Sequence, residues 1–310
     1  MIKPGIPYVG GMSEHRHLDH STHHDLDWDS PTTAARTELE GEVLAGLVER
    51  ALSVLVDLCV AGRLNVRRIL DLGCGPGVAT CLLAQRFGSA TVLAVDGAAE
   101  MLDRATARVR LLALDQRVQT RLVELPAGLE NLEQADVVWA SMVLHHVGDE
   151  VAALRQVRRL LRPGGLLAVV EHGGGVRVLP ADPDLGRPGL WERLDAAGEA
   201  WFRDMRADLP ETTESGSYVD MLRLAGFSVL ADELLTLELD PPLDERARHF
   251  ANDYLLRTRR QLEPYADCAD LKALDMLVDE RASGSILRRD DALLSASRRF
   301  YVAAAVSAAA

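Results

Sequence analysis

Several features that mark other protein classes are missing from this 310-residue sequence. The four cysteines are scattered and form no C-x-x-C pair, which disfavours a thiolate zinc site or a disulfide framework and suits a reducing compartment. The first residues form no apolar signal segment, and no run of 18 uninterrupted apolar residues occurs. We therefore expect a cytoplasmic protein that does not enter a membrane.

Positive charge is also scarce. The formal net charge is −13, and only two of the 34 basic residues, Lys3 and Lys272, are lysines. A surface of this sign repels phosphate backbones, so the sequence predicts no nucleic-acid partner. With 48% hydrophobic and 26% charged residues, the chain has the composition of a globular protein that buries a core.

Strand-like and helix-like segments alternate from residue 67 to residue 173. Periodicity predicts strands at 67–73, 90–96, 118–125, 135–144 and 165–173, and helices at 77–88, 98–115 and 150–165. Strands joined by helices of this length form right-handed βαβ units in a parallel sheet. An α/β fold follows.

The flanking regions are predicted from local signals. Ser30 and Pro31 suit the start of a helix that runs to about Gly62. Beyond residue 173 the sequence suggests an amphipathic helix at 186–208 over the sheet, a helix and a strand within 217–240, and a last strand at 297–307. The expected division is an N-terminal arm or lid (1–30), a core (31–240), a helical insertion that caps the substrate (241–290) and the final strand of the core (291–310).

Three alternating glycines, Gly73, Gly75 and Gly77, stand between the first predicted strand and the first helix. Ligands of α/β sheets bind beyond the carboxyl ends of the strands, and glycine lets a ligand approach the backbone closely. A dinucleotide fingerprint needs G-x-G-x-x-G, a spacing that this turn lacks, and no G-K-[S/T] of a P-loop follows. An NAD(P)-dependent oxidoreductase is thus the weaker interpretation.

The stretch DLGCGPG (71–77) resembles motif I of class I S-adenosylmethionine (SAM)-dependent methyltransferases. Three later stretches resemble the same family in the family's order: LAVDGAAEML (93–102), DVVWASMVLHHV (136–147) and LLRPGGLLAVVE (160–171). The resemblance covers roughly residues 66–172. It implies a Rossmann-like, seven-stranded methyltransferase sheet flanked by helices, which here carries a C-terminal helical insertion.

The resemblance also implies a site for SAM, with S-adenosylhomocysteine (SAH) as product. The Asp96 carboxylate would accept hydrogen bonds from both ribose hydroxyls, and Asp71 would help to hold the ammonium. Arg36 would pair with the cofactor carboxylate, although an ordinary charge on a helix face is the alternative. The expected cofactor contacts are Asp71, Gly73, Gly75, Gly77, Asp96, Gly97, Met101, Glu124, Leu125, Ser141 and Arg36.

For several of these residues, an ordinary structural role is the alternative to cofactor binding. Asp96 could simply cap a helix, and methionines at helical spacing, such as Met101, are usually core residues. Many family members have Gly-Asp-Ala after the third strand, whereas this chain has Val123, Glu124 and Leu125. The adenine contact assigned to Glu124 therefore departs from the family pattern.

Methyl transfer from a sulfonium depends mainly on alignment, and a general base is needed only if the acceptor must lose a proton. His146 and His172 are the candidate bases, ahead of His145. The acceptor is expected to be a small molecule, methylated on O, N or C, as in the bacterial small-molecule methyltransferases that the layout resembles. Aromatic side chains could line its pocket: Trp191, Trp201, Phe202, Phe250 and Tyr254.

Two further interpretations stay open. The chain could be a non-catalytic SAM-binding or metal-sensing protein. The stretch HRHLDHSTHHD (15–25) has metal-ligand chemistry, but it has no recognised ligand spacing, so a polar arm is the simpler explanation and no metal is predicted. A homodimer is the assembly considered.

Overall fold

Seven strands form one mixed sheet in the computed structural model, which describes residues 27–181, 183–207, 209 and 217–306. The strands are β1 (Arg68–Leu72), β2 (Thr91–Asp96), β3 (Val118–Leu122), β4 (Ala135–Ser141), β5 (Leu161–His172), β6 (Phe227–Leu239) and β7 (Leu294–Ala305). Their order is β3-β2-β1-β4-β5-β7-β6, with β7 antiparallel to both of its neighbours. The predicted α/β fold with a Rossmann-like, seven-stranded methyltransferase sheet is confirmed.

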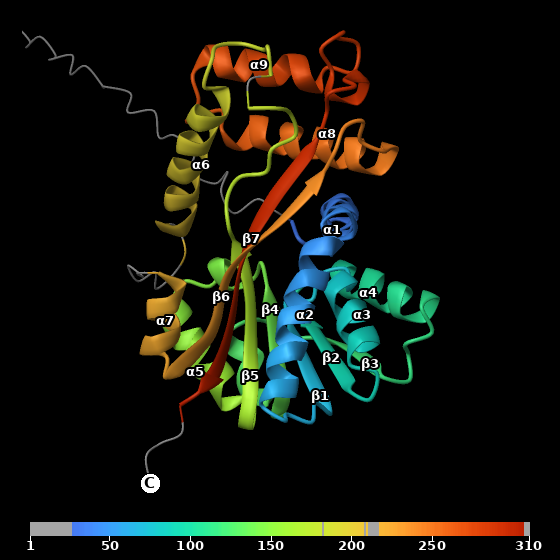
Figure 1. Ribbon diagram of the computed structural model, residues 1–310, viewed down its shortest axis with the longest axis vertical. Helices are drawn as coiled ribbons and strands as arrows, with labels where there is room; N and C mark the ends of the chain where they lie inside the picture. The colour runs from blue at the N-terminus through green and yellow to red at the C-terminus, as the bar shows by residue number, and fades with distance from the viewer. Residues whose placement is uncertain (1–26, 182, 208, 210–216, 307–310) are drawn as a thin grey trace, which may run out of the picture.

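Helices cover both faces of this sheet (Figure 1). They are α1 (Pro31–Val43), α2 (Ala45–Ala61), α3 (Val78–Arg86), α4 (Ala99–Leu111), α5 (Glu150–Arg159), α6 (Leu190–Ala207), α7 (Tyr218–Leu224), α8 (Glu245–Gln261) and α9 (Cys268–Val278), with 3₁₀ turns η2 (Ala127–Asn131), η3 (Leu144–His146) and η4 (Ile286–Arg288). In β4, Trp139 belongs to the core beneath α2 and α3, whereas Val138 and Ala140 belong to the core beneath α5 and α7. Successive side chains of a strand point to opposite faces, so a fully buried strand serves two cores.

The single helix predicted from Ser30 to Gly62 is two helices, α1 and α2, which meet at Leu44. Gly41 and Gly46 flank the break, and glycine is a weak helix former. The two halves also cover different surfaces, since α1 contacts α4 and α8 while α2 contacts β6 and β7. The Ser30 hydroxyl caps none of the N–H groups of α1 within the described chain, so only Pro31 acts as predicted at this start.

The helices α6, α8 and α9 lie beyond the carboxyl ends of the parallel strands (Figure 1). The helix predicted at 186–208 is therefore present as α6, but it does not cover a sheet face. In the sequence, α8 and α9 stand between β6 and β7. The division into domains stays a prediction, and residues 1–26 of the expected arm lie outside the described part of the chain.

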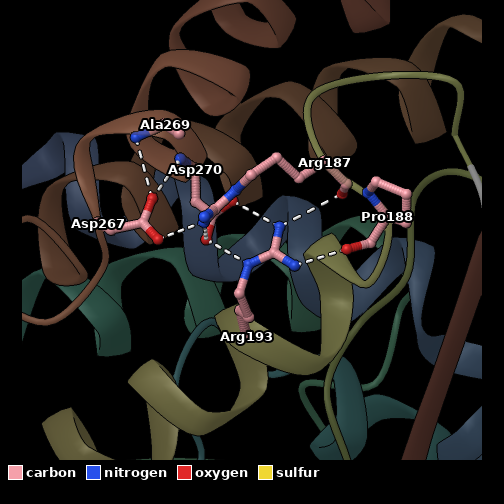
Figure 2. Close-up of polar contacts among 6 residues, drawn as sticks. All are labelled: Arg187, Pro188, Arg193, Asp267, Ala269 and Asp270. Atoms are coloured by element: carbon pink, nitrogen blue, oxygen red, sulfur yellow. Dashed lines mark hydrogen bonds and ion pairs between the residues drawn. The ribbon is translucent and has the colours of Figure 1, made fainter.

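Ion pairs join α6 to α9 (Figure 2). The Arg193 guanidinium donates Nε and Nη2 to the two carboxylate oxygens of Asp270, each at 2.7 Å. Arg187 donates to Asp270 at 3.2 Å and also pairs with Asp267, which caps the start of α9. These ion pairs join α6 to α9 within the helical layer, by which we mean α6, α8 and α9 beyond the strand ends. Of the helices in the described residues, none has the length and apolar character needed to cross a membrane.

Candidate cofactor and catalytic site

The glycine turn joins the end of β1 to the start of α3. Gly73, Gly75 and Gly77 all have positive φ values, of +64°, +52° and +78°. A Cβ on Gly73 would overlap Val143, and one on Gly77 would lie 2.9 Å from the Cα of Ala105. Two of the three glycines are therefore required by the packing of the protein itself.

Gly75 differs from its two neighbours. Among the described residues, a Cβ there would meet only the methyl group of Thr37, at 3.7 Å. The Gly75 N–H donates to Oδ2 of Asp96 at 2.8 Å, and the Ala98 N–H donates to Oδ1 at 3.0 Å. Burial raises the pKa of Asp96, and these backbone hydrogen bonds oppose that rise. A carboxylate offers about four acceptor positions, so Asp96 keeps capacity for further donors.

A different residue, Asp29, supplies an oxygen to the first turn of α4. Its Oδ1 accepts from the N–H groups of Ala99 and Glu100, at 2.7 and 3.3 Å. The helix-cap alternative for Asp96 is thus not what the structure shows. Beside Asp29, the Trp28 ring stands edge-on to His146 with centroids 5.4 Å apart. Sequence reasoning missed both contacts, because each joins residues far apart in the chain without a local signal.

Asp71 is buried at the end of β1. Its Oδ2 accepts from the Thr80 hydroxyl at 2.5 Å. Burial raises the pKa of Asp71 to about 7, opposed by the Thr80 hydrogen bond. The side chain therefore ties β1 to α3 beneath the glycine turn.

The remaining predicted cofactor residues surround the ends of β2, β3 and β4. The Glu124 carboxylate lies beside Gly97, since a Cβ on Gly97 would be 3.1 Å from Oε2 of Glu124. Met101 is buried with Ala34 and Ala98, as its core alternative anticipates. Leu125 packs against the core beneath α5, and Ser141 is half-buried at the end of β4.

Arg36 is directed to the helical layer. Its Nε lies 3.1 Å from Oδ2 of Asp253 on α8. The structure therefore places Arg36 at the junction between α1 and α8, where its charge has a carboxylate partner, and its predicted contact with the cofactor stays a prediction.

Three histidines meet where β4 and β5 end. Nδ1 of His145 lies 2.6 Å from Oε2 of Glu171, and both side chains are buried. The ring centroid of His145 is 4.1 Å from that of His146 and 4.8 Å from that of His172. Phe202 of α6 stands edge-on to His172 at 5.6 Å. Of the three histidines, only His145 is buried; His146 and His172 are exposed.

Burial disfavours the charged forms of both His145 and Glu171. Burial lowers the pKa of His145 to about 4, and the positive charges of Arg206 and Arg298 add to this effect. Burial also raises the pKa of Glu171 to about 7. At neutral pH the imidazole of His145 is therefore uncharged, and one of its two ring nitrogens carries no proton.

A charged cluster, in which Arg298 is buried and Glu40 and Arg257 are half-buried, borders the histidines. Glu40 of α1 accepts from Arg298 of β7 at 3.2 Å and from Arg257 of α8 at 3.3 Å. Burial alone would raise the pKa of Glu40, but the two guanidinium groups outweigh it and lower the pKa. Phe250 and Tyr254, two of the predicted pocket aromatics, line a cavity of about 10 Å³ beside this cluster.

The other predicted pocket aromatics belong to α6. Trp191 is buried and donates to the Pro180 carbonyl at 3.0 Å, and Trp201 is half-buried against the same core. In the described ranges, no group of three or more His, Cys, Asp or Glu side chains is arranged to hold a metal ion. The His-rich stretch 15–25 lies outside those ranges.

Comparisons with known proteins agree with this geometry. Residues 70–167 match the family model described as "Methyltransferase domain". This part of the chain is a class I SAM-dependent methyltransferase domain, as its motifs indicate. Over 102 residues the chain is 41% identical to the biotin biosynthesis bifunctional protein BioCD of Bordetella avium, a match that covers 33% of this chain and 21% of that protein.

A second curated relative matches a stretch of similar length. The trans-aconitate 2-methyltransferase of Azoarcus sp. is 36% identical over 104 residues, which cover 33% of this chain and 37% of the relative. Among solved structures, the YcgJ protein of Bacillus subtilis has 16% identity and a TM-score of 0.46, with 84% of this chain and all of that chain covered. The chain thus spans only about a fifth to two fifths of the length of these two curated relatives.

Proposed function

We propose that the whole protein binds SAM and transfers its methyl group to an O, N or C atom of a small-molecule acceptor. One observation carries the proposal: within the methyltransferase domain, the backbone of Gly75 is hydrogen-bonded to the Asp96 carboxylate across two adjacent strand ends. This hydrogen bond holds the Asp96 carboxylate next to the glycine turn, at the edge where α/β sheets bind their ligands. At Gly75 the turn is open.

The residues at this edge suit the parts of the cofactor. Asp96 offers free acceptor positions to the ribose hydroxyls, and Glu124, on the other side of Gly97, offers a carboxylate to the adenine amine. When bound, SAM supplies a methyl group on a sulfonium. The protein's part is to hold and orient the reactants, which is worth roughly 7–11 kcal/mol of the barrier.

The acceptor is proposed to bind among the elements that follow the matched domain. The helices α6, α8 and α9 lie beyond the strand ends (Figure 1), and Phe202 and Phe250 bring apolar surface close to the histidines and the charged cluster. These helices lie outside the matched residues 70–167. The acceptors named for the relatives therefore give no specific substrate for this chain. Assembly as a homodimer stays a prediction.

Calorimetric titration with SAM, SAH and NADH tests the proposal. We expect micromolar binding of SAM and SAH and weaker binding of NADH. Asp96→Ala should weaken SAM binding by roughly 100-fold, since it removes charge-assisted hydrogen bonds of about 3 kcal/mol in all. Asp103→Ala, which removes an exposed carboxylate from α4, is the matched control and should leave the affinity unchanged.

Asp96 also accepts two backbone hydrogen bonds, so a melting curve must show that the variant is folded, and Asp96→Asn gives a milder replacement. Absence of SAM binding by folded wild-type protein would refute the proposal. Preference for NADH would favour the oxidoreductase alternative. SAM binding without transfer to any acceptor would favour a non-catalytic SAM-binding protein.

A further inference from the structure

A buried imidazole–carboxylate pair lies at the carboxyl ends of β4 and β5. His145 comes from η3, directly after β4, and Glu171 from the end of β5. Their side-chain atoms are 2.6 Å apart, and Oε1 of Glu171 accepts from the Leu144 N–H at 3.0 Å. Each carboxylate oxygen of Glu171 thereby has a partner, and the contact with Oε2 holds Nδ1 of His145 in place.

The other ring nitrogen of His145, Nε2, is not held by the carboxylate. No hydrogen bond to Nε2 is formed by the residues that the structure describes. The ring is flanked by His146, His172 and, at 6.1 Å between centroids, Phe202 of α6. When Nδ1 carries the proton and donates to Glu171, Nε2 is the proton-accepting atom of the ring.

Charges from several elements surround this ring. Arg206 of α6 donates to the carbonyl oxygen of His145 at 2.8 Å, and Arg298 of β7 is paired across the sheet with His172. Both cations favour the neutral imidazole in the resting protein. Glu171 has the opposite effect when it is ionised, because its negative charge then stabilises a protonated imidazole ring at hydrogen-bond distance.

We propose that His145 is the general base of this methyltransferase, with Glu171 as its positioning residue, and that the acceptor is a compound whose hydroxyl or N–H group loses its proton on methylation. The inference rests on the proposed function and adds the class of acceptor. It also differs from the sequence-based prediction, which put His146 and His172 first. Those two rings are exposed, whereas the structure gives the carboxylate partner to His145.

In the proposed transfer, one bond forms and one breaks at the methyl carbon. A lone pair of the acceptor oxygen or nitrogen forms the bond to the methyl carbon, and the carbon–sulfur bond breaks with its electron pair left on sulfur. The acceptor proton passes to Nε2 of His145. The imidazolium keeps its Nδ1–H···Glu171 hydrogen bond and later releases the Nε2 proton to solvent.

Transfer assays on the full chain test the base. Radiolabelled SAM is offered with two panels, one of phenols, alcohols and amines and one of carboxylic acids, which react as carboxylates without losing a proton. We expect transfer to members of the first panel. His145→Gln should lower kcat at least 100-fold and abolish the acid-side fall of kcat/KM, with the Kd of SAM within twofold of wild type. His249→Gln, an exposed histidine of α8, is the matched control.

Glu171→Gln gives a sharper test of positioning. The glutamine oxygen can accept from the Leu144 N–H, so its amide would donate to Nδ1 of His145 and force the ring proton onto Nε2. We expect ¹⁵N NMR of histidine-labelled protein to show the proton on Nδ1 in the wild type and on Nε2 in the variant. Loss of kcat should accompany the change in tautomer.

Any one of four results would overturn the inference. They are transfer only to carboxylates, no transfer to the first panel, full activity in a folded His145→Gln protein, and an Nε2–H tautomer in the wild type. Should His145→Gln not fold, His145→Asn replaces it, and restoration of activity by added imidazole supports the base. If SAM binds while any contrary result is obtained, this inference fails and the proposed cofactor function stands.

Discussion

The buried carboxyl group of Asp71 shows how a single residue couples stability to pH. Its pKa in the folded protein is about 7, above its usual value near 3.8, because burial disfavours the charged form. Between these two values the folded state binds more protons than the unfolded state. The contribution of Asp71 to stability is therefore complete below about pH 4 and is lost as the pH rises to about 7.

Asp71→Asn should remove this dependence while keeping an acceptor for the Thr80 hydroxyl. We expect the variant to melt at a higher temperature than wild type at pH 8 and at a similar temperature at a pH below about 4, where the Asp71 carboxyl group is largely protonated in both the folded and the unfolded state. Differential scanning calorimetry at the two pH values measures the effect, with Asp103→Asn as an exposed control. A difference that is the same at both pH values would show that Asp71 is not the titrating group.

At the scale of elements, the ion pairs between α6 and α9 hold the helical layer together (Figure 2). Asp270 is buried, and its hydrogen bonds with Arg193 lower its pKa. Because its pKa is lowered, Asp270 contributes its full stabilisation above about pH 3.8, the usual pKa of the group. This contribution is lost as the pH falls below that value.

Asp270→Asn should therefore lower the melting temperature at pH 7 by roughly 3–6 °C, because the fork of Arg193 loses its charged partner. The gap should close below about pH 3, where the wild-type carboxyl is also neutral. Glu280→Gln, an exposed carboxylate just after α9, serves as control. Equal melting of Asp270→Asn and wild type at pH 7 would mean that these ion pairs do not stabilise the layer.

The elements that sequence reasoning located well are those with strong local periodicity. The strands β1, β2 and β4 and the glycine turn fall where their patterns predict, since apolar runs and turn residues are properties of short stretches. The break at Leu44, the contact of Asp29 with α4 and the pairing of His145 with Glu171 depend on distant partners. No short stretch of sequence records such partners, so the identity of the buried histidine had to come from the fold.

For the whole molecule, the arrangement predicts where a bound cofactor changes dynamics. Before α1, Asp29 contacts the start of α4 and Trp28 contacts η3. Thr37 of α1 lies beside Gly75. Cofactor bound between these elements should hold them closed and suppress local opening.

Hydrogen exchange with and without SAH should therefore show slowing in residues 28–37, 73–77 and 96–101. Exchange in α9, which lies in the helical layer and is fixed by its own ion pairs, should change least. A uniform slowing that includes α9 would indicate global stabilisation instead of closure over the glycine turn.

The order of the strands has a consequence for synthesis on the ribosome. Among the described strands, β6 is paired with β7 alone, and β7 follows it only after residues 240–293. At translation rates of about 5–20 residues per second, these residues take roughly 3–11 s to be added. Throughout that interval the nascent chain carries a long strand without a partner strand, and such an unpaired edge is an aggregation hazard until β7 is made.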